Sequence, residues 1–338
     1  MHKRILFYAS VPDIKLFNTQ YFYKIDIKIL RDLGYTVSVT NKLIDFIYFW
    51  RYNLAFIYFY RFGLFAAIAA WIFNKKIYFT GGIDDLDKDF ASNYNYFIQR
   101  IFFRLCYFFS TKCIIVSNGD YNNIKKAYHN KLKRKITLSF HAIDLDTYTK
   151  DIPRVKDNHF ITIAWMGSKG NVIRKGVDRA IYLFNSIIKT YPKFEGSNLF
   201  IVGLEGEGSD YLKQEIEKLK ICDRVVFTGV VDEKSKLQLL KQNKFYLQLS
   251  EYEGFGIAAL EALATKCVVI HSGKGGLKDS ISHYGILIDN ELDITLQTNK
   301  IMVNIDNFDI DSFEKATSYI SQYFSFEKRM KDFNNILT

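Results

Sequence analysis

The amino-acid sequence predicts an α/β protein made of two doubly wound, Rossmann-like domains, and three observations support this. Its 338 residues suffice for two domains, each with a hydrophobic core of its own. Short apolar runs alternate with stretches of helical periodicity in both halves, a pattern typical of parallel β-α-β units. Between the halves, residues 146–158 are polar, include Pro153 and show little periodicity, as a linker does.

The apolar runs that we expect to form strands fall into two series. In the first half they cover residues 5–9, 36–40, 46–49, 77–80, 113–116 and 136–139. In the second half they cover residues 161–166, 199–202, 225–228, 245–249, 268–270 and 286–288. A last amphipathic stretch has apolar residues at helical spacing. We therefore expect a first domain over residues 1–150, a second over 159–310, and a helical segment over 311–338 that packs back on the first domain.

The composition excludes several classes of protein. Hydrophobic residues make up 49% of the chain and charged residues 24%, which rules out a disordered or collagen-like chain. The four cysteines form no CxxC pair, so we expect neither a disulfide scaffold nor a cysteine-rich zinc site. The histidines have no metal-ligand spacing either. These features favour a reducing, cytoplasmic environment, and we expect no metal and no cofactor.

The positive charge lies in the first half of the chain. Residues 1–150 hold 22 Lys+Arg against 11 Asp+Glu, whereas residues 151–338 hold 24 against 25. Basic residues such as Arg51 and Arg61 stand among aromatic ones, a combination that suits an anionic lipid surface. No nucleic-acid-binding motif accompanies this charge. We therefore expect an anionic membrane surface, and no nucleic acid, as a partner of the first half.

The most membrane-like stretch, residues 45–73, is interrupted by Arg51 and Arg61. The remaining apolar run, residues 62–73, is shorter than the roughly 20 residues that span a bilayer. We expect a buried strand and helix here, with a shallow surface contact as the alternative. The first apolar run, residues 5–9, is too short for a signal peptide. The expected location is thus cytoplasmic and peripheral, on the inner face of the cell membrane.

Two loops of the second half have features of ligand-binding loops. Ligands of open parallel sheets bind at the carboxyl ends of the strands. Residues 167–176 follow the first strand of this half, contain glycines and include the cations Arg174 and Lys175, as a phosphate site would. A merely solvated basic loop is the alternative. Gly203, Gly206 and Gly208 follow the next strand and allow close backbone approach to a ligand, or a plain turn.

A third loop carries the most information. Gly254 and Gly256 free two amides at the start of the helix 257–263, where the helix dipole favours an anion. Glu261 interrupts that otherwise apolar helix, and a buried carboxylate is costly unless it is paired. It therefore lies on an exposed helix face, in an internal ion pair, or against a ligand hydroxyl.

Glu253 and Glu261, with Gly254-Phe255-Gly256 between them, resemble the E-x7-E signature of glycosyltransferase family 4. Other segments resemble motifs of the same family in the same order across residues 160–290. These are Arg174-Lys175-Gly176-Val177-Asp178, Phe200-Ile201-Val202-Gly203, Val226-Phe227-Thr228-Gly229 and Gly275-Gly276-Leu277-Lys278-Asp279. Leu249 stands where that family usually has proline.

The resemblance implies a GT-B fold, in which two Rossmann-like domains face each other across a cleft. It implies a retaining, metal-independent transferase that moves a sugar from a nucleotide-sugar donor to a lipid-linked or growing surface glycan, of polysaccharide, O-antigen or capsule type. The first domain would bind the acceptor and the second the nucleotide-sugar. A catalytically silent scaffold of the same fold, or a sugar-nucleotide hydrolase or epimerase, is the alternative.

The resemblance also implies roles for residues. Lys175, with Arg174 beside it, would contact the donor diphosphate; Glu261 would hold the ribose hydroxyls, and Glu253 would lie near the sugar. The amides from Gly254 to Ile257 would meet the sugar hydroxyls and phosphate. The other donor-side positions are Ser168, Gly203, Val230, Ser250, Phe255 and Gly256. Ser168, Lys169 and Arg174 are all candidates for the arginine that usually precedes the lysine.

The acceptor side is represented by an acidic turn in the first half. Asp84 and Asp85 follow the expected strand 77–80, so they would lie at a carboxyl strand end. Our hypothesis is that one of them orients the acceptor hydroxyl and serves catalysis with Glu253 and Lys175. A solvated acidic turn without a role is the alternative.

Overall fold

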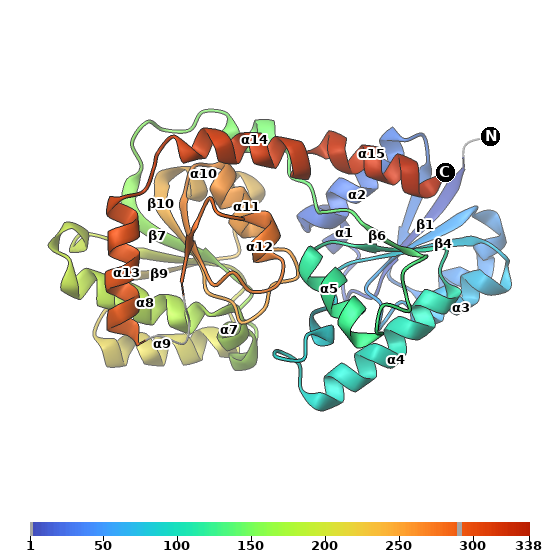
Figure 1. The fold of residues 1–338 in the computed structure, drawn as a ribbon, viewed down its shortest axis with the longest axis horizontal. Helices are drawn as coiled ribbons and strands as arrows, with labels where there is room; N and C mark the ends of the chain where they lie inside the picture. Colours follow the sequence, from blue (N-terminus) through green and yellow to red (C-terminus); the bar gives the residue numbers. More distant parts are fainter. Residues whose placement is uncertain (1–2, 289–292) are drawn as a thin grey trace. The chain divides into compact units, whose positions relative to one another are not determined.

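The computed structural model describes residues 3–288 and 293–338, which form two compact units (Figure 1). Unit 1 comprises the chain up to Asp144 together with Gln322–Thr338, and unit 2 comprises Leu145–Ser321. Each unit contains a six-stranded sheet. All strand pairs of both sheets are parallel, as expected from the alternation of strands and helices.

The sheet of unit 1 has the strand order β2-β1-β3-β4-β5-β6. Its strands are β1 (Arg4–Ala9), β2 (Thr36–Thr40), β3 (Leu54–Tyr58), β4 (Lys76–Thr80), β5 (Lys112–Ile115) and β6 (Ile136–Leu138). After β1 the chain adds β2 on one side of that strand, and it then crosses back to add β3 to β6 on the other side. The connections before and after this reversal lie on opposite faces, so helices cover both faces of the sheet. The middle strand β3 is buried along its whole length, as expected for a strand covered on both faces.

Helices cover both faces of this sheet. One face carries η1 (Leu43–Arg51), α3 (Leu64–Ile72), α4 (Asn93–Phe109) and α5 (Asn118–Ala127), whose apolar side chains pack together in one core cluster. The other face carries α1 (Leu16–Thr19), α2 (Tyr21–Asp32) and the C-terminal α15 (Phe326–Leu337), which share the second cluster. The short η2 (Asp84–Leu86) follows β4.

One expected strand of unit 1 is wrong. Residues 46–49 lie inside η1, and the third strand is β3, a few residues further on. In η1, Phe46 and Phe49 are buried while Ile47 and Tyr48 are exposed. A stretch with one buried side suits a helical turn that covers a sheet. A central strand must be apolar on both faces, and β3 is.

The C-terminal stretch 311–337 is helical but forms two helices. These are α14 (Ser312–Phe324) and α15, and Ser325 separates them as the N-cap of α15, accepting a hydrogen bond from the Lys328 amide. The boundary between the two units falls within α14. Arg329 of α15 is buried in unit 1, where Nε and Nη2 donate to the two carboxylate oxygens of Asp26 at 2.6 and 2.7 Å.

The sheet of unit 2 has the order β12-β11-β10-β7-β8-β9. Its strands are β7 (Asp157–Ile163), β8 (Leu199–Val202), β9 (Val225–Gly229), β10 (Asn243–Gln248), β11 (Val268–His271) and β12 (Ile286–Leu287). Figure 1 shows α10 and α11 on one side of this sheet and α8 and α9 on the other. Unit 2 is therefore doubly wound as well.

The helices of unit 2 follow the strands in alternation. They are α6 (Leu145–Thr149), α7 (Lys169–Lys175), α8 (Val177–Thr190), η3 (Pro192–Phe194), α9 (Glu207–Leu219), α10 (Glu233–Gln242), α11 (Ile257–Ala264), α12 (Leu277–Ser280) and α13 (Ile294–Asp306). No helix among the described residues is both long enough and apolar enough to cross a bilayer.

Candidate functional site

The candidate site lies in unit 2, where the loops after β7 and β10 meet. The loop after β7 leads into α7, which ends at Gly176 in the left-handed conformation. The loop after β10, residues 249–256, leads into α11. The Glu251 amide donates to the Arg174 carbonyl at 2.9 Å, which joins the loop after β10 to the end of α7 through their backbones. The site thus occupies the carboxyl ends of neighbouring parallel strands.

Lys175 and Glu253 form an ion pair at this junction. Lys175 Nζ donates to both carboxylate oxygens of Glu253, at 2.7 and 2.8 Å. The side chains are 21% and 14% exposed, so the pair is largely shielded from water but is still reached by it. Breaking a partly exposed ion pair costs less free energy than breaking a fully buried one, so a ligand can take the place of one partner more easily here.

Behind Glu253, a chain of polar side chains holds its carboxylate in place. Ser250 Oγ donates to Glu253 Oε2 at 3.1 Å, Gln248 Nε2 donates to Ser250 Oγ at 2.7 Å, and Tyr246 donates to Gln248 Oε1 at 2.9 Å. Burial, with Glu253 and Glu261 nearby, raises the pKa of Tyr246 well above its ordinary value, so it stays protonated as a donor. Ser250, Gln248 and Tyr246 are all buried, which orients Glu253 from one side.

Two glycines allow the close backbone contacts that this junction needs. Gly176 has φ +67°, and a Cβ there would lie 2.0 Å from the Leu249 carbonyl oxygen. Gly275 has φ +61°, and a Cβ there would lie 2.2 Å from the Glu253 carbonyl oxygen. Both positions combine a left-handed backbone with contact to a neighbouring main chain, so only glycine fits them without movement.

Arg174, unlike Lys175, is held by a residue of its own helix, α7. Ser168 caps α7 by accepting a hydrogen bond from the Asn171 amide, and Arg174 Nη2 donates to Asn171 Oδ1 at 3.0 Å. Arg179, in the first turn of α8, donates to the carbonyls of Ile173 at 2.9 Å and Leu249 at 3.1 Å. Arg179 therefore ties the end of α7 to the loop after β10.

The start of α11 has the features of an anion site. Gly256 is its N-cap, with φ +87°, and the first turn contains no acidic residue. Ser280 Oγ is buried and, among the described residues, has no hydrogen-bond partner. It lies 3.3 Å from the position that a Cβ of Gly256 would take. First-turn amides, the positive end of the helix dipole and a hydroxyl without a partner together favour an anion or sugar hydroxyl here.

Glu261 forms a buried ion pair, one of the alternatives left open by the sequence. Its side chain is 1% exposed. Tyr148 donates to Oε1 at 2.6 Å, and Lys236 Nζ lies 3.0 Å from Oε1 and 2.9 Å from Oε2. Burial raises the pKa of Glu261, with Lys236 and Tyr148 opposing that rise. Burial by itself would lower the pKa of Lys236, but the carboxylates of Glu261 and Glu233 outweigh it and raise that pKa.

The structure gathers some of the predicted residues and leaves others apart. Lys175, Ser250 and Glu253 are joined by hydrogen bonds, and Phe255 and Gly256 are buried beside them. Gly203 and Val230 follow the neighbouring strands β8 and β9, and the Val230 side chain is 70% exposed. Asp84 and Asp85 lie in unit 1, in η2 after β4. They do not belong to the cluster of unit 2.

The sequence interpretation missed several residues of the site, among them Tyr148, Arg179, Lys236 and Gln248. Gln248 had a usable signal, because it is a polar residue at the end of an apolar strand. Lys236 and Tyr148 stand on short helices without any distinctive pattern, and only their contacts with Glu261 reveal them. Within residues 3–288 and 293–338, no cluster of three His, Cys, Asp or Glu side chains suited to a metal ion occurs.

Comparison with known families gives a match in the same part of the chain. Residues 166–308 match the family of glycosyl transferases group 1. The matched segment contains the two loops, α11 and both glutamates of the candidate site. The resemblance drawn from the motifs is confirmed at the level of this broad family. Membership of family 4 and the role of the E-x7-E pair stay predictions.

Curated relatives match over part of their length. An uncharacterized glycosyltransferase of Methanocaldococcus jannaschii is 34% identical over 110 residues, which are 32% of this chain and 27% of that protein. The O-antigen chain mannosyltransferase RfbU of Salmonella typhimurium is 23% identical over 233 residues, which are 67% of this chain and 61% of that protein. The first of these matches thus spans about a quarter of the relative's length.

Solved structures match over the whole chain. Anabaena HepE, in a crystal structure with UDP and glucose, has a TM-score of 0.76 at 18% identity and covers 99% of both chains. Sucrose-phosphate synthase of Thermosynechococcus elongatus has a TM-score of 0.74 at 13% identity, over 100% of this chain and 98% of that one. These likenesses confirm the expected fold class, GT-B with two doubly wound domains.

Proposed function

We propose that this protein is a glycosyltransferase of family 4, with the nucleotide-sugar bound by unit 2. The arrangement of Lys175, Glu253 and the glycine-bounded start of α11 is the observation that supports this most directly. It sets a cation, a carboxylate and free helix amides at one edge of a parallel sheet. A nucleotide diphosphate-sugar requires such partners, because it presents two phosphates and a ring of hydroxyls.

Sugar transfer breaks the bond between the anomeric carbon and the diphosphate, so negative charge builds on the leaving diphosphate. In this proposal Lys175 leaves Glu253 and pairs with that charge, while Arg174 and the first amides of α11 add further positive partners. Glu253, released from Lys175 but still held by Ser250, faces the sugar. Fixed cations and amides would then serve without a bound metal, and transfer would retain the anomeric configuration.

A uridine diphosphate-sugar is the first donor to test, because the solved structure of HepE was obtained with UDP-glucose. The acceptor in this proposal is a lipid-linked or growing surface glycan of polysaccharide, O-antigen or capsule type; the relative RfbU acts on an O-antigen chain according to its name. Asp84 or Asp85 of unit 1 would orient the acceptor hydroxyl. The protein would work in the cytoplasm at the inner face of the membrane.

The experiment that tests this is an assay of UDP release from a panel of UDP-sugars, with EDTA present, with and without a lipid-linked acceptor. Release that depends on the acceptor supports transfer, and undiminished release without acceptor indicates a hydrolase instead. Glu253→Gln should abolish most of the turnover. Glu251→Gln is the matched control, because Glu251 lies in the same loop but is exposed and pairs with Arg179. Equal activity of both variants would contradict the role of Glu253.

A further inference from the structure

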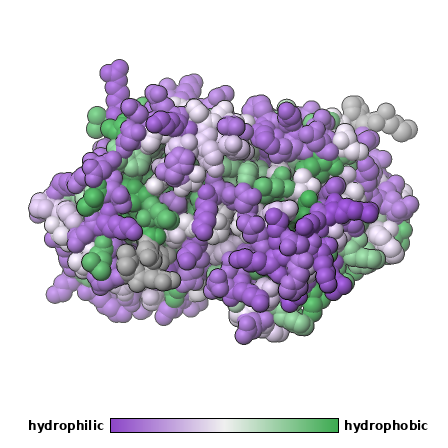
Figure 2. Space-filling view, in the orientation of Figure 1, coloured by the Kyte–Doolittle hydropathy of each residue, from purple (hydrophilic) through white to green (hydrophobic). Residues whose placement is uncertain are grey.

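Exposed apolar side chains gather on one face of unit 1. They stand on η1, on α3 with the turn before it, and on α4, and we call them the apolar surface. Its members are Ile44, Ile47, Trp50, Phe62, Phe65, Trp71, Ile72, Phe97, Ile101, Leu105 and Phe108, each at least 41% exposed. Figure 2 shows apolar atoms at the surface over α3 and α4, in the lower right of the view. An exposed patch of this kind marks an interaction site in a folded protein.

The three elements present these side chains as one continuous surface. Residues 97, 101, 105 and 108 recur along one side of α4, so they form a single stripe. Trp71 at the end of α3 contacts Phe109 at the end of α4, with ring centroids 5.4 Å apart. Trp50 of η1 contacts Phe73, which caps α3, at 6.1 Å. The stripes of η1, α3 and α4 therefore lie side by side.

Positive charge accompanies this surface. Neither α3 nor α4 contains an acidic residue, and α4 carries Arg100 and Arg104. Arg51 stacks over the exposed rings of Tyr48 and Trp50, at 5.2 and 5.9 Å from their centroids. Cations placed among exposed aromatic rings are the pattern of a protein face that enters the headgroup region of an anionic bilayer.

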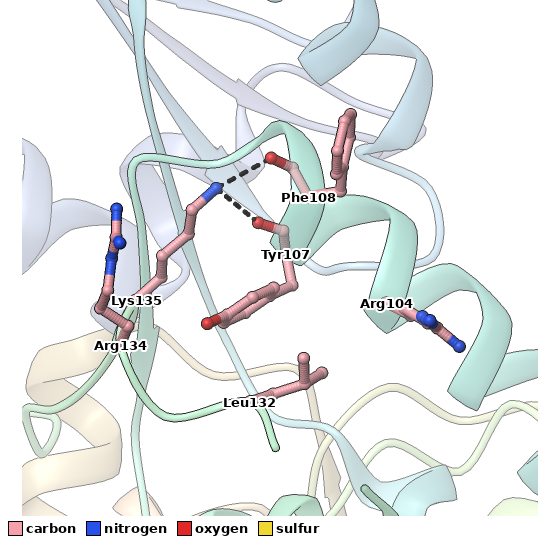
Figure 3. A pocket seen from close by; sticks show the side chains of 6 residues that line it. All are labelled: Arg104, Tyr107, Phe108, Leu132, Arg134 and Lys135. Atoms are coloured by element: carbon pink, nitrogen blue, oxygen red, sulfur yellow. Dashed lines mark hydrogen bonds between the residues drawn. The ribbon is translucent and has the colours of Figure 1, made fainter.

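A pocket of about 390 Å³ opens at the carboxyl end of α4, beside the apolar surface (Figure 3). We call it the cationic pocket; its lining residues are Arg104, Tyr107, Phe108, Leu132, Arg134 and Lys135. Lys135 Nζ donates to the carbonyls of Tyr107 at 3.0 Å and Phe108 at 2.8 Å, which closes the end of α4. The lining also contains Arg104 and Arg134, which are exposed, no carboxylate, and three apolar or aromatic side chains. Since Lys135 is bound to the carbonyls, the two arginines are the cations that could pair with a phosphate attached to an apolar body.

We propose that unit 1 binds anionic phospholipid bilayers through the apolar surface and takes a lipid phosphate in the cationic pocket. Aliphatic side chains such as Ile72 and Leu105 gain from entry into the acyl boundary, whereas a phosphodiester backbone would offer them nothing. Lys and Arg near such a membrane each add about 1 kcal/mol of attraction. Binding to the bilayer would bring unit 1 to the lipid-linked acceptor of the proposed function. Only this biological purpose of the binding rests on the proposed function.

The test is co-sedimentation of the full chain with vesicles, without any donor, at low and high salt. Vesicles of phosphatidylcholine alone are compared with vesicles of phosphatidylcholine and phosphatidylglycerol. We expect binding only to the anionic vesicles. The double variant Arg104→Gln/Arg134→Gln should weaken that binding about 30-fold, the equivalent of the two lost charges. Phe65→Ser/Phe108→Ser should weaken it at least about tenfold through lost apolar burial.

Matched controls come from exposed residues of unit 2. Lys234→Gln/Lys244→Gln removes the same net charge, and Val303→Ser/Ile310→Ser removes exposed apolar side chains. All the substituted residues are exposed, so we expect unchanged melting curves. Absence of binding to anionic vesicles overturns the proposal, and so does equal weakening by test and control variants. A nucleic-acid surface would be indicated instead if a DNA oligonucleotide released the protein from the vesicles and Phe65→Ser/Phe108→Ser bound the vesicles as well as the parent does. None of these outcomes bears on UDP release, which is measured separately.

Discussion

Lys175 and Glu253, 78 residues apart in the sequence, form a two-oxygen ion pair at the junction of two loops of unit 2. Each is the natural partner of a different part of a nucleotide-sugar, the lysine for phosphate and the carboxylate for hydroxyls. In the proposed function, a donor that enters this junction exchanges with this internal pair, and the buried hydroxyl of Ser250 would keep one carboxylate oxygen of Glu253 bound when the lysine leaves.

Lys175→Met should reduce turnover more than donor affinity. The lysine would act on charge that develops as the diphosphate leaves, and removal of one such fixed partner costs roughly 10²- to 10³-fold in kcat. Steady-state kinetics of UDP release measures this. Lys213→Met is the control, because Lys213 lies on α9 of the same unit and pairs with Glu205 at the surface. A Lys175 variant that loses no more activity than the Lys213 variant would show that the lysine has no part in transfer.

Glu261→Leu should lower the free energy of unfolding by about 3 kcal/mol, because the largely buried Lys236 then keeps only the half-exposed Glu233 as a carboxylate partner. The double variant Glu261→Leu/Lys236→Met should recover most of that loss, since two apolar residues then replace the pair. Denaturant unfolding of each variant measures both effects. Glu233→Gln is the control, because Glu233 also contacts Lys236 but is 49% exposed.

The same double variant separates stability from ligand binding. If Glu261 holds the ribose hydroxyls, UDP should not stabilise the folded double variant in thermal melts. A saturating ligand, at about 100 times its Kd, stabilises the parent by roughly 2.7 kcal/mol. Full stabilisation by UDP in the double variant would restrict Glu261 to a structural role.

Arg329→Met should destabilise unit 1 by about 3–5 kcal/mol, because Asp26 is completely buried and loses both hydrogen bonds from the guanidinium. Arg329 also donates to the carbonyls of Ser139 at 2.9 Å and Phe140 at 2.7 Å, which the methionine cannot replace. Chemical denaturation is the measurement. The neighbouring Lys328→Met removes a partly exposed pair with Asp332 and should cost about 1 kcal/mol.

His271 should make the protein less stable in mild acid. Burial lowers its pKa to about 4, from an ordinary value of 6.5. Between these two values the unfolded chain takes up a proton that the folded chain does not, so stability falls as the pH falls from 6.5 towards 4. The slope for one group is about 1.4 kcal/mol per pH unit.

His271→Leu should remove this contribution, because leucine does not titrate. Among the described residues neither ring nitrogen has a hydrogen-bond partner, so the substitution breaks no hydrogen bond. At pH 7 the variant should lie within about 1 kcal/mol of the parent, and its relative stability should rise as the pH falls. Melting temperatures from pH 7 to pH 4.5 measure this, with the exposed His283→Leu as the control. Parallel curves for His271→Leu and the parent would contradict the assignment.

The site was partly predictable because several of its features are local in the sequence. The glycines around Phe255 precede an apolar helix, and Lys175 ends a short helix after a strand. Such strand-loop-helix patterns are read within a few residues. The partner of Glu261 was not predictable in this way. Lys236 stands 25 residues earlier, on a helix whose sequence gives no sign that one lysine points inward.

The sequence by itself determined the alternation of strands and helices, hence two doubly wound sheets, and the positions where glycine frees the backbone. It misplaced the third strand because the apolar residues of η1 and β3 follow each other closely, and their burial depends on what packs above them. Tertiary structure alone decided which charges meet, as with Asp26 and Arg329, 303 residues apart. The physical reason is that secondary structure follows from local periodicity, whereas an ion pair depends on which distant segments pack against one another.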